Sequence, residues 1–246
     1  VASYQPRDLS PLIAAHRPDL VVVRMYLSFE SPSADYSRGQ AASARANGCR
    51  VASYCWAYQN ADPRQTVQEA VALARECGIV LPQHAAGPED VLWLDVEPYH
   101  GTLPDLAWLL QAVDECSLQE MCAGIYTGRR VWEGRLGDSH DLSHLPLWAA
   151  QYDGDPSLDT VTLYGGWDHA SGKQWSCVPV DQDTFLEAVA AWTASSPSPY
   201  LVPELDLLWD RLDRAQRRTR SRTVLRWLEE AKQDGVVAIK RRLGYT

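Results

Sequence analysis

Short apolar runs that alternate regularly with amphipathic stretches constrain the fold of this chain more than any other feature. The runs are rich in β-branched and aromatic residues, and their lengths are typical of buried strands. They cover residues 20–26, 50–56, 91–97, 123–127 and 147–152. Helix-like segments separate or precede them at 8–17, 37–47, 64–78, 104–121 and 129–136. This alternation predicts a parallel sheet covered by helices.

The alternation ends after the fifth run. Strand-like pieces follow at 173–177 and 178–181 without a stretch long enough for a crossover helix, and a last helix is predicted from Asp183 to Trp192. A first strand is expected at 2–5. The sequence therefore predicts an α/β fold, an irregular (β/α)-barrel of the TIM type with five helices, in which the last three strands lack crossover helices.

The C-terminal segment differs from the rest of the chain in charge. Residues 1–196 carry 12 basic and 25 acidic side chains, a net charge of −13, whereas residues 197–246 carry 11 and 7, a net charge of +4. A Ser/Pro-rich linker at 194–200 separates a barrel domain at 1–193 from a basic, amphipathic helical arm at 201–246. The arm is expected to contact a protein partner or a larger assembly, and the overall charge of −9 argues against nucleic acid as a partner.

Composition and spacing exclude several kinds of site and location. The six cysteines show no Cys-x-x-Cys pair, so buried free thiols in a protein made in a reducing cytoplasm are expected. No run of 18 apolar residues could span a membrane, and the N-terminus shows no signal peptide. No metal or organic cofactor is expected: residues 166–174 depart from phosphate-loop spacing, and His140 and His144 lack a third ligand.

Two carboxylates at the end of the third apolar run are the strongest chemical signal. Asp95 and Glu97 stand two residues apart, so in a strand both side chains point to the same face. In a barrel, active sites form at the carboxyl ends of the strands. Burial and mutual repulsion would raise one pKa and leave an acid beside a base, as glycoside cleavage requires. The alternative is structural, an Asp that caps a loop next to a solvated Glu.

Aromatic side chains gather at the same strand ends. The chain has 10 Trp and 11 Tyr but 2 Phe. Tyr and Trp combine a flat apolar face with a polar edge, which suits stacking on sugar rings. As a set they favour a carbohydrate groove, although core packing is the alternative for each of them. The set comprises Tyr26, Tyr54, Trp56, Tyr99, Tyr126, Trp148, Tyr152 and Trp175.

Seven short motifs occur in order along residues 1–192. They are 1–5, 47–54, Leu94-Asp95-Val96-Glu97, Gly124-Ile125-Tyr126-Thr127, 147–152, Gln174-Trp175-Ser176 and 180–185. Together they resemble the glycoside hydrolase family 25 muramidases, lysozymes found among phage endolysins and bacterial autolysins. The resemblance implies a barrel with five helices and three closing strands. It also implies cleavage of the β-1,4 bond between N-acetylmuramic acid and N-acetylglucosamine in peptidoglycan, with no cofactor.

The resemblance assigns roles by position. Glu97 matches the proton donor, and Asp95 matches the residue that stabilises the intermediate or orients the substrate N-acetyl group. Asp181, which follows Val180 as the pattern requires, matches a third acidic residue; Asp183 lies close by. The positions that match the sugar groove are Tyr54, Tyr126, Trp148 and Gln151, to which the aromatic set adds Trp56, Tyr99, Tyr152 and Trp175.

The sequence differs from the family pattern at its N-terminal end. The family pattern places an active-site Asp directly before the position of Val1, where this chain starts. Two interpretations follow. The first is a lysozyme-type glycosidase, which a phage could encode. The second is a catalytically impaired barrel that binds carbohydrate or serves as a structural component of an assembly such as a phage tail. We predict the enzyme, made in a host cytoplasm and acting on the cell wall.

Overall fold

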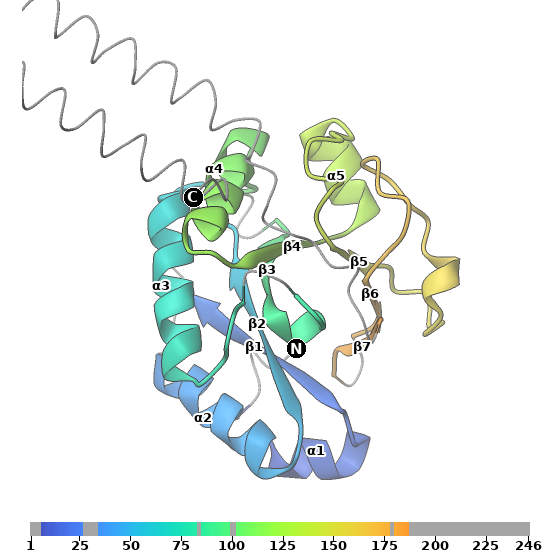
Figure 1. The fold of residues 1–246 in the computed structure, drawn as a ribbon. Coiled ribbons are helices and arrows are strands. Elements are labelled where there is room, and N and C mark those ends of the chain that lie inside the picture. The colour runs from blue at the N-terminus through green and yellow to red at the C-terminus, as the bar shows by residue number, and fades with distance from the viewer. Residues whose placement is uncertain (1–5, 27–33, 83–84, 99–101, 178–179, 187–246) are drawn as a thin grey trace, which may run out of the picture. The chain divides into compact units, whose positions relative to one another are not determined.

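Seven strands form one curled sheet in the part of the chain that the computed structural model describes, residues 6–26, 34–82, 85–98, 102–177 and 180–186. The strand order follows the chain, and neighbours pair in parallel from β1 to β6 (Figure 1). The strands are β1 (Leu20–Tyr26), β2 (Arg50–Trp56), β3 (Val91–Val96), β4 (Cys122–Thr127), β5 (Leu147–Ala150), β6 (Gly172–Ser176) and β7 (Gln182–Phe185).

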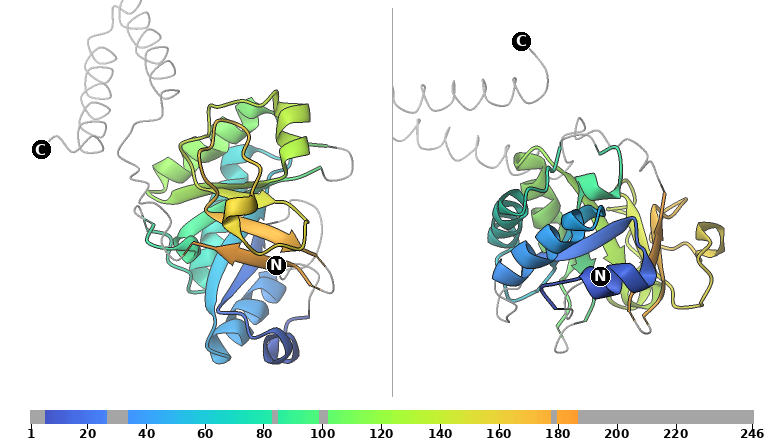
Figure 2. Two further views of the ribbon diagram at one scale, coloured as in Figure 1. Left: turned by 90° about the vertical axis from the view of Figure 1, so that its right-hand side faces the viewer. Right: turned by 90° about the horizontal axis from the view of Figure 1, so that it is seen from below.

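Helices cover the outer face of this sheet (Figures 1 and 2). They are α1 (Ser10–His16), α2 (Ala34–Ala46), α3 (Pro63–Glu76), α4 (Leu106–Leu118) and α5 (Arg129–Leu136). Asp62 and Asp105 cap α3 and α4 by accepting a backbone N–H of the first turn. The predicted alternation of strand and helix is therefore confirmed from α1 to β5. None of the described helices is long and apolar enough to cross a membrane.

The prediction is wrong at the end of the sheet. Instead of a helix from Asp183, residues Gln182–Phe185 form β7, which runs antiparallel to β6. The four residues of β7, Gln182-Asp183-Thr184-Phe185, are too few to show an alternation of apolar and polar side chains, and pairing with β6 holds them extended. The connection from β5 to β6 contains one short 3-10 turn, Leu158–Thr160, and no α-helix within its described residues, as expected.

Several predicted segments fall outside the described residues. They include the first strand at 2–5, most of the last helix, the linker at 194–200, the arm at 201–246 and Tyr99. Closure of the sheet into a full TIM-type barrel and the domain boundaries therefore stay predictions.

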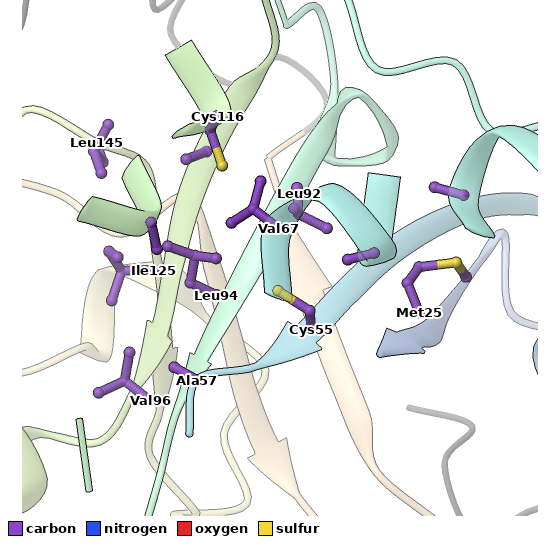
Figure 3. Packing of buried hydrophobic residues seen from close by; sticks show 14 of the residues in the cluster. Met25, Cys55, Ala57, Val67, Leu92, Leu94, Val96, Cys116, Ile125 and Leu145 are labelled. Atoms are coloured by element: carbon purple, nitrogen blue, oxygen red, sulfur yellow. The ribbon is translucent and has the colours of Figure 1, made fainter. Parts of the chain in front are cut away.

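Period-two alternation divides the strand residues between two apolar clusters. One set packs under the helices, in a cluster that includes Met25, Cys55, Leu94 and Ile125 together with Val67 of α3 (Figure 3). The intervening residues face the concave side of the sheet. They include Val22, Ala52, Tyr54, Trp93, Tyr126, Trp148 and Phe185. The helices thus cover the outer cluster, and large aromatic rings fill the inner one.

Two glycines make room for these rings. A Cβ on Gly124 would lie 2.6 Å from the Trp93 ring, and one on Gly172 would lie 2.5 Å from the Phe185 ring. Trp93 therefore packs over β4 and reaches Trp148, with ring centroids 5.8 Å apart in an edge-to-face arrangement. The concave side of the sheet has a dry aromatic floor.

We expect Gly124→Ala to destabilise the protein by about 1–3 kcal/mol, because the added methyl group overpacks this floor. Urea denaturation should show a lower midpoint with an unchanged slope. Gly134→Ala is the matched control, since an added Cβ on this exposed residue of α5 meets nothing within 4 Å. Helix propensity should make that variant more stable by up to about 1 kcal/mol. Equal stability of Gly124→Ala and the wild type would contradict the close packing.

Candidate active site

Three carboxyl groups gather at the carboxyl end of the sheet, above the aromatic floor. Asp95 is the fifth residue of β3, and Glu97 follows the strand directly. The backbone here is held on both sides: the Ala57 N–H donates to Asp95 O at 2.9 Å, and Thr127 Oγ1 donates to Val96 O at 2.8 Å. These contacts fix the direction of both carboxyl side chains.

The electrostatics of the cluster show that its members interact. Burial raises the pKa of Asp95 well above its usual range, and the negative charges of Glu97 and Asp181 raise it further. The buried cation Arg24 opposes that rise. Burial also raises the pKa of Glu97, the hydrogen bond from Tyr126 opposes that rise, and the charge of Asp181 adds to it. The predicted carboxylates Asp95, Glu97 and Asp181 therefore lie within electrostatic range of one another.

Asp95 and Glu97 differ in access to solvent. Asp95 is 4% exposed, and its Oδ1 accepts no hydrogen bond from the described residues. Glu97 is half-buried, beyond the last residue of β3. A bound molecule could therefore reach Glu97 more directly than Asp95.

Tyrosine hydroxyls lie beside Glu97. The Tyr126 hydroxyl oxygen is 3.3 Å from Glu97 Oε1 and 3.2 Å from the Tyr152 hydroxyl. Tyr126 is buried, whereas Tyr152 is 54% exposed. Both hydroxyls also contact Gln174 Oε1 at 2.6 Å. The structure thus places the predicted groove residues Tyr126 and Tyr152 next to the carboxyl cluster.

Two other predicted groove residues belong to the floor of the site. Tyr54 is 2% exposed and Trp148 is 1% exposed, so their rings pack inside the sheet. Trp148 contacts Tyr126, with ring centroids 4.5 Å apart, and its indole N–H donates to Asp183 Oδ1 at 3.1 Å. Trp56, half-buried, pairs with Asp95 across β2 and β3 and lies nearer the open end than Tyr54.

Sequence reasoning gave no role to three residues of this cluster. Arg24 interrupts the apolar run of β1, and that interruption was an available signal. Asp183 is half-buried, and burial together with the charge of Asp181 raises its pKa to about 6. Gln174 was part of a quoted motif, but only the pairing of β6 with β7 places it beside Asp183.

The segment that contains the carboxyl groups of the site matches a known protein family. Residues 31–183 match the model of Glycosyl hydrolases family 25. This segment includes Asp95, Glu97 and Asp181, whereas Arg24 lies before it. The chain belongs to glycosyl hydrolase family 25. Among the described residues, no group of three or more His, Cys, Asp or Glu side chains is arranged to hold a metal ion.

Curated relatives of this family 25 chain come from Dictyostelium discoideum. Probable GH family 25 lysozyme 3 is 36% identical over 117 residues, which cover 43% of this chain and 24% of that protein. Counting factor 50 is 30% identical over 118 residues, covering 43% of this chain and 39% of that protein. The chain therefore spans well under half the length of these relatives.

A solved structure has a similar fold. It is the modular Cpl-1 endolysin complexed with a peptidoglycan analogue, which aligns with a TM-score of 0.52 at 13% identity. The alignment covers 77% of this chain and 53% of the endolysin chain. At this level of identity the similarity concerns the fold.

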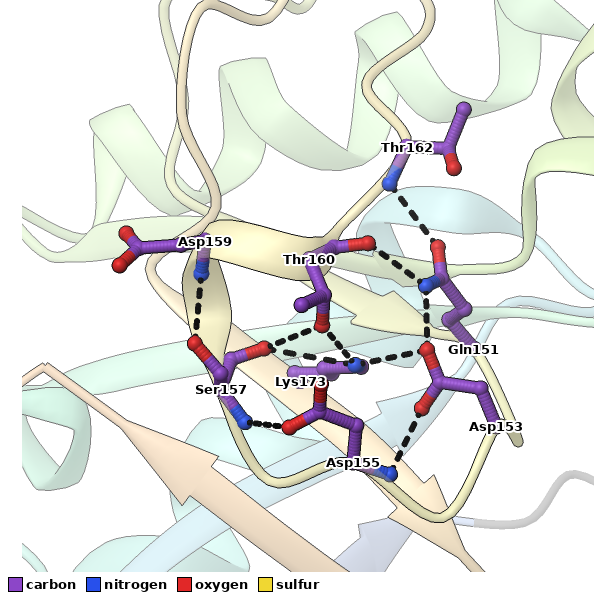
Figure 4. Close-up of polar contacts among 8 residues, drawn as sticks. All are labelled: Gln151, Asp153, Asp155, Ser157, Asp159, Thr160, Thr162 and Lys173. Carbon is purple, nitrogen blue, oxygen red and sulfur yellow. Dashed lines mark hydrogen bonds and ion pairs between the residues drawn. The ribbon is translucent and has the colours of Figure 1, made fainter.

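Gln151 does not join the cluster. Its amide holds the loop after β5, where Nε2 donates to Asp153 Oδ2 at 2.6 Å and Oε1 accepts the Thr162 N–H at 2.9 Å (Figure 4). The fully buried Lys173 completes this loop by donating to Asp153 at 2.9 Å and to Thr160 Oγ1 at 2.7 Å. Gln151 therefore shapes the segment that carries Tyr152, and the predicted groove role has no support from its contacts.

Trp175 also lies apart from the tyrosines. It lines a hollow that borders β1 and β7, together with Leu20 and Asp181, and its indole N–H has no hydrogen-bond partner in the described part of the chain. A role for Trp175 in binding sugar stays a prediction.

The loop network predicts a pH-dependent stability. Hydrogen bonds from Gln151 and Lys173 lower the pKa of Asp153 to about 2, below its ordinary 3.8. The stabilisation by ionised Asp153 is therefore complete above pH 3.8 and is lost as the pH falls through about 2. We expect Asp153→Asn to destabilise the protein at neutral pH, because the buried ammonium of Lys173 loses its ionic partner, and this difference from the wild type should shrink toward pH 2 in denaturation curves.

Asp159→Asn is the control for this experiment, since the Asp159 carboxylate points away from the network (Figure 4). Its effect on stability should be smaller than that of Asp153→Asn. A stability difference for Asp153→Asn that stayed constant from neutral pH to pH 2 would contradict the assignment.

Proposed function

We propose that this chain hydrolyses the glycan strands of peptidoglycan, at the β-1,4 bond between N-acetylmuramic acid and N-acetylglucosamine. The observation that carries the proposal is the cluster of Asp95, Glu97 and Asp181 at one end of the sheet, where burial raises the pKa of each carboxyl group. Family membership and the names of the lysozyme and endolysin relatives support the substrate class.

Glu97 acts as the general acid. It lies beyond the buried interior, so its proton can reach the oxygen of a glycosidic bond, and burial raises the pKa of Glu97, which favours its protonated form. Proton transfer to that oxygen lets the bond to the sugar carbon break, and positive charge develops at that carbon.

Asp95 and Asp181 stabilise the developing charge. Asp95 lies in a low-dielectric setting, where its ionised carboxylate attracts a cationic centre strongly. Arg24 keeps that carboxylate accessible by lowering its pKa against the effect of burial. Asp181 adds negative charge from the side of β7.

Two aromatic side chains that are accessible at the site supply surfaces for sugar rings. Tyr152 is the most exposed aromatic side chain of the site, and Trp56 is half-buried near the carboxyl end of β2. Flat rings with polar edges stack on the apolar faces of sugars. We propose the cell wall as the place of action, while attachment to a larger assembly through 201–246 stays a prediction.

We expect Glu97→Gln to lose about 10²–10⁴-fold of the activity on purified peptidoglycan, because the amide cannot donate a proton to the leaving oxygen. The rate of turbidity loss measures the activity. Borohydride reduction of the wild-type products followed by mass spectrometry identifies the new reducing end, which should be muramic acid.

Glu69→Gln is the matched control. It makes the same chemical change on the exposed face of α3 and should keep the wild-type rate. The proposal fails if wild type and Glu97→Gln clear the suspension equally slowly, which would leave a carbohydrate-binding domain. Reducing ends made of glucosamine would show that a different bond is cut.

A further inference from the structure

Gln174 lies at the centre of the polar contacts beside Glu97. It is 2% exposed on β6 and pairs directly with Asp183 across the antiparallel β6–β7 ladder. Its Oε1 accepts the hydroxyls of Tyr126 and Tyr152, each at 2.6 Å. An amide oxygen has two lone pairs, so these two hydrogen bonds fill it.

Asp183 orients the Gln174 amide. The Gln174 side chain donates a hydrogen bond to the Asp183 carboxyl group, which lowers the pKa of Asp183 against the stronger effect of burial. Only the NH₂ end of an amide donates, so that end faces Asp183 and the carbonyl end faces the two tyrosines. The direction of the amide therefore follows from its cross-strand neighbour.

The hydrogens around Tyr126 can then be counted. Its hydroxyl oxygen lies 2.6 Å from Gln174 Oε1 and 3.3 Å from Glu97 Oε1, and it has one hydrogen. An amide oxygen cannot donate, so the hydrogen in the shorter contact comes from Tyr126. Tyr126 also lies within donating distance of Glu97, and a hydrogen bond from Tyr126 lowers the pKa of Glu97. Because the single hydroxyl hydrogen engages Gln174 in the shorter contact, it is drawn away from Glu97 and this lowering is weakened.

We propose that Gln174 is a positioning residue that keeps Glu97 in its acid form by engaging the hydroxyl hydrogen of Tyr126. The proposal rests on the proposed role of Glu97 as proton donor. A Tyr126 O–H that pointed at Glu97 would instead stabilise the carboxylate, and the general acid would be deprotonated at a lower pH.

Other ionisable groups of the site interact with Glu97 directly or through a neighbouring carboxyl group, and a substitution at Gln174 replaces none of them. They come from β1, β3, the segment after β5, and the β7 region, and comprise Arg24, Asp95, Tyr152, Asp181 and Asp183. Asp183 loses its hydrogen bond from Gln174 in such a variant, so a second substitution is needed to isolate the effect of Tyr126.

Gln174→Leu removes the acceptor and frees the Tyr126 hydroxyl to donate to Glu97. We expect the apparent pKa of Glu97 to fall by about one unit, and the alkaline limb of the kcat–pH profile to move to lower pH by the same amount. In the double variant Gln174→Leu/Tyr126→Phe no hydroxyl remains to donate, so most of the fall should disappear.

Tyr152→Phe is the matched control. It removes a hydroxyl from the same cluster but leaves the Tyr126–Gln174 hydrogen bond, so the pKa of Glu97 should stay in place whatever happens to the rate. If thermal denaturation shows that Gln174→Leu is unfolded, Gln174→Met, which has a side chain closer in shape to glutamine, takes its place.

Carbon-13 NMR of the glutamate carboxyl groups measures the pKa without requiring activity, and Glu97→Gln identifies the resonance. An unchanged or raised pKa in Gln174→Leu, or the same fall in the double variant, overturns the proposal. A fall that depends on Tyr126 supports it even if the wild type leaves peptidoglycan intact, in which case only the proposed function fails.

Discussion

The site depends on burial of carboxyl groups above a dry aromatic floor. Strand residues alternate between a helix-covered cluster and a concave side filled by Trp93, Trp148 and Phe185. Because Asp95 at the end of β3 is buried against that floor, its charged form is disfavoured. The glycines that admit these rings are therefore as important to the chemistry as the carboxyl groups that lie above them.

The carboxyl groups of the site are electrostatically coupled, although they differ in burial. Asp95 is more deeply buried than Glu97, and both titrate under the influence of Asp181, so the protons belong to the set rather than to one residue. Arg24, whose positive charge lowers the pKa of Asp95, is buried, whereas Tyr126 lies beside Glu97. In the proposed reaction Glu97, the more accessible group, donates the proton, and Arg24 favours the charged form of Asp95 as positive charge develops.

Much of the fold followed from local pattern, because buried parallel strands are continuous apolar runs and the helices between them carry caps and an apolar stripe. Asp95 and Glu97 could be found from their spacing alone. β7 was missed because four residues give too short an alternation to recognise before its partner strand is known. The contacts of Gln151 and Gln174 also needed the structure: whether a polar residue at a strand end faces the site or a loop depends on the neighbouring strand or loop.

The most direct test of the account is a crystal structure of Glu97→Gln with a tetrasaccharide of alternating N-acetylglucosamine and N-acetylmuramic acid. The account predicts that a glycosidic oxygen lies within about 2.6–3.2 Å of the side-chain amide at position 97, with a sugar ring against Tyr152. A tetrasaccharide bound on another surface, with no glycosidic oxygen near position 97, would contradict it.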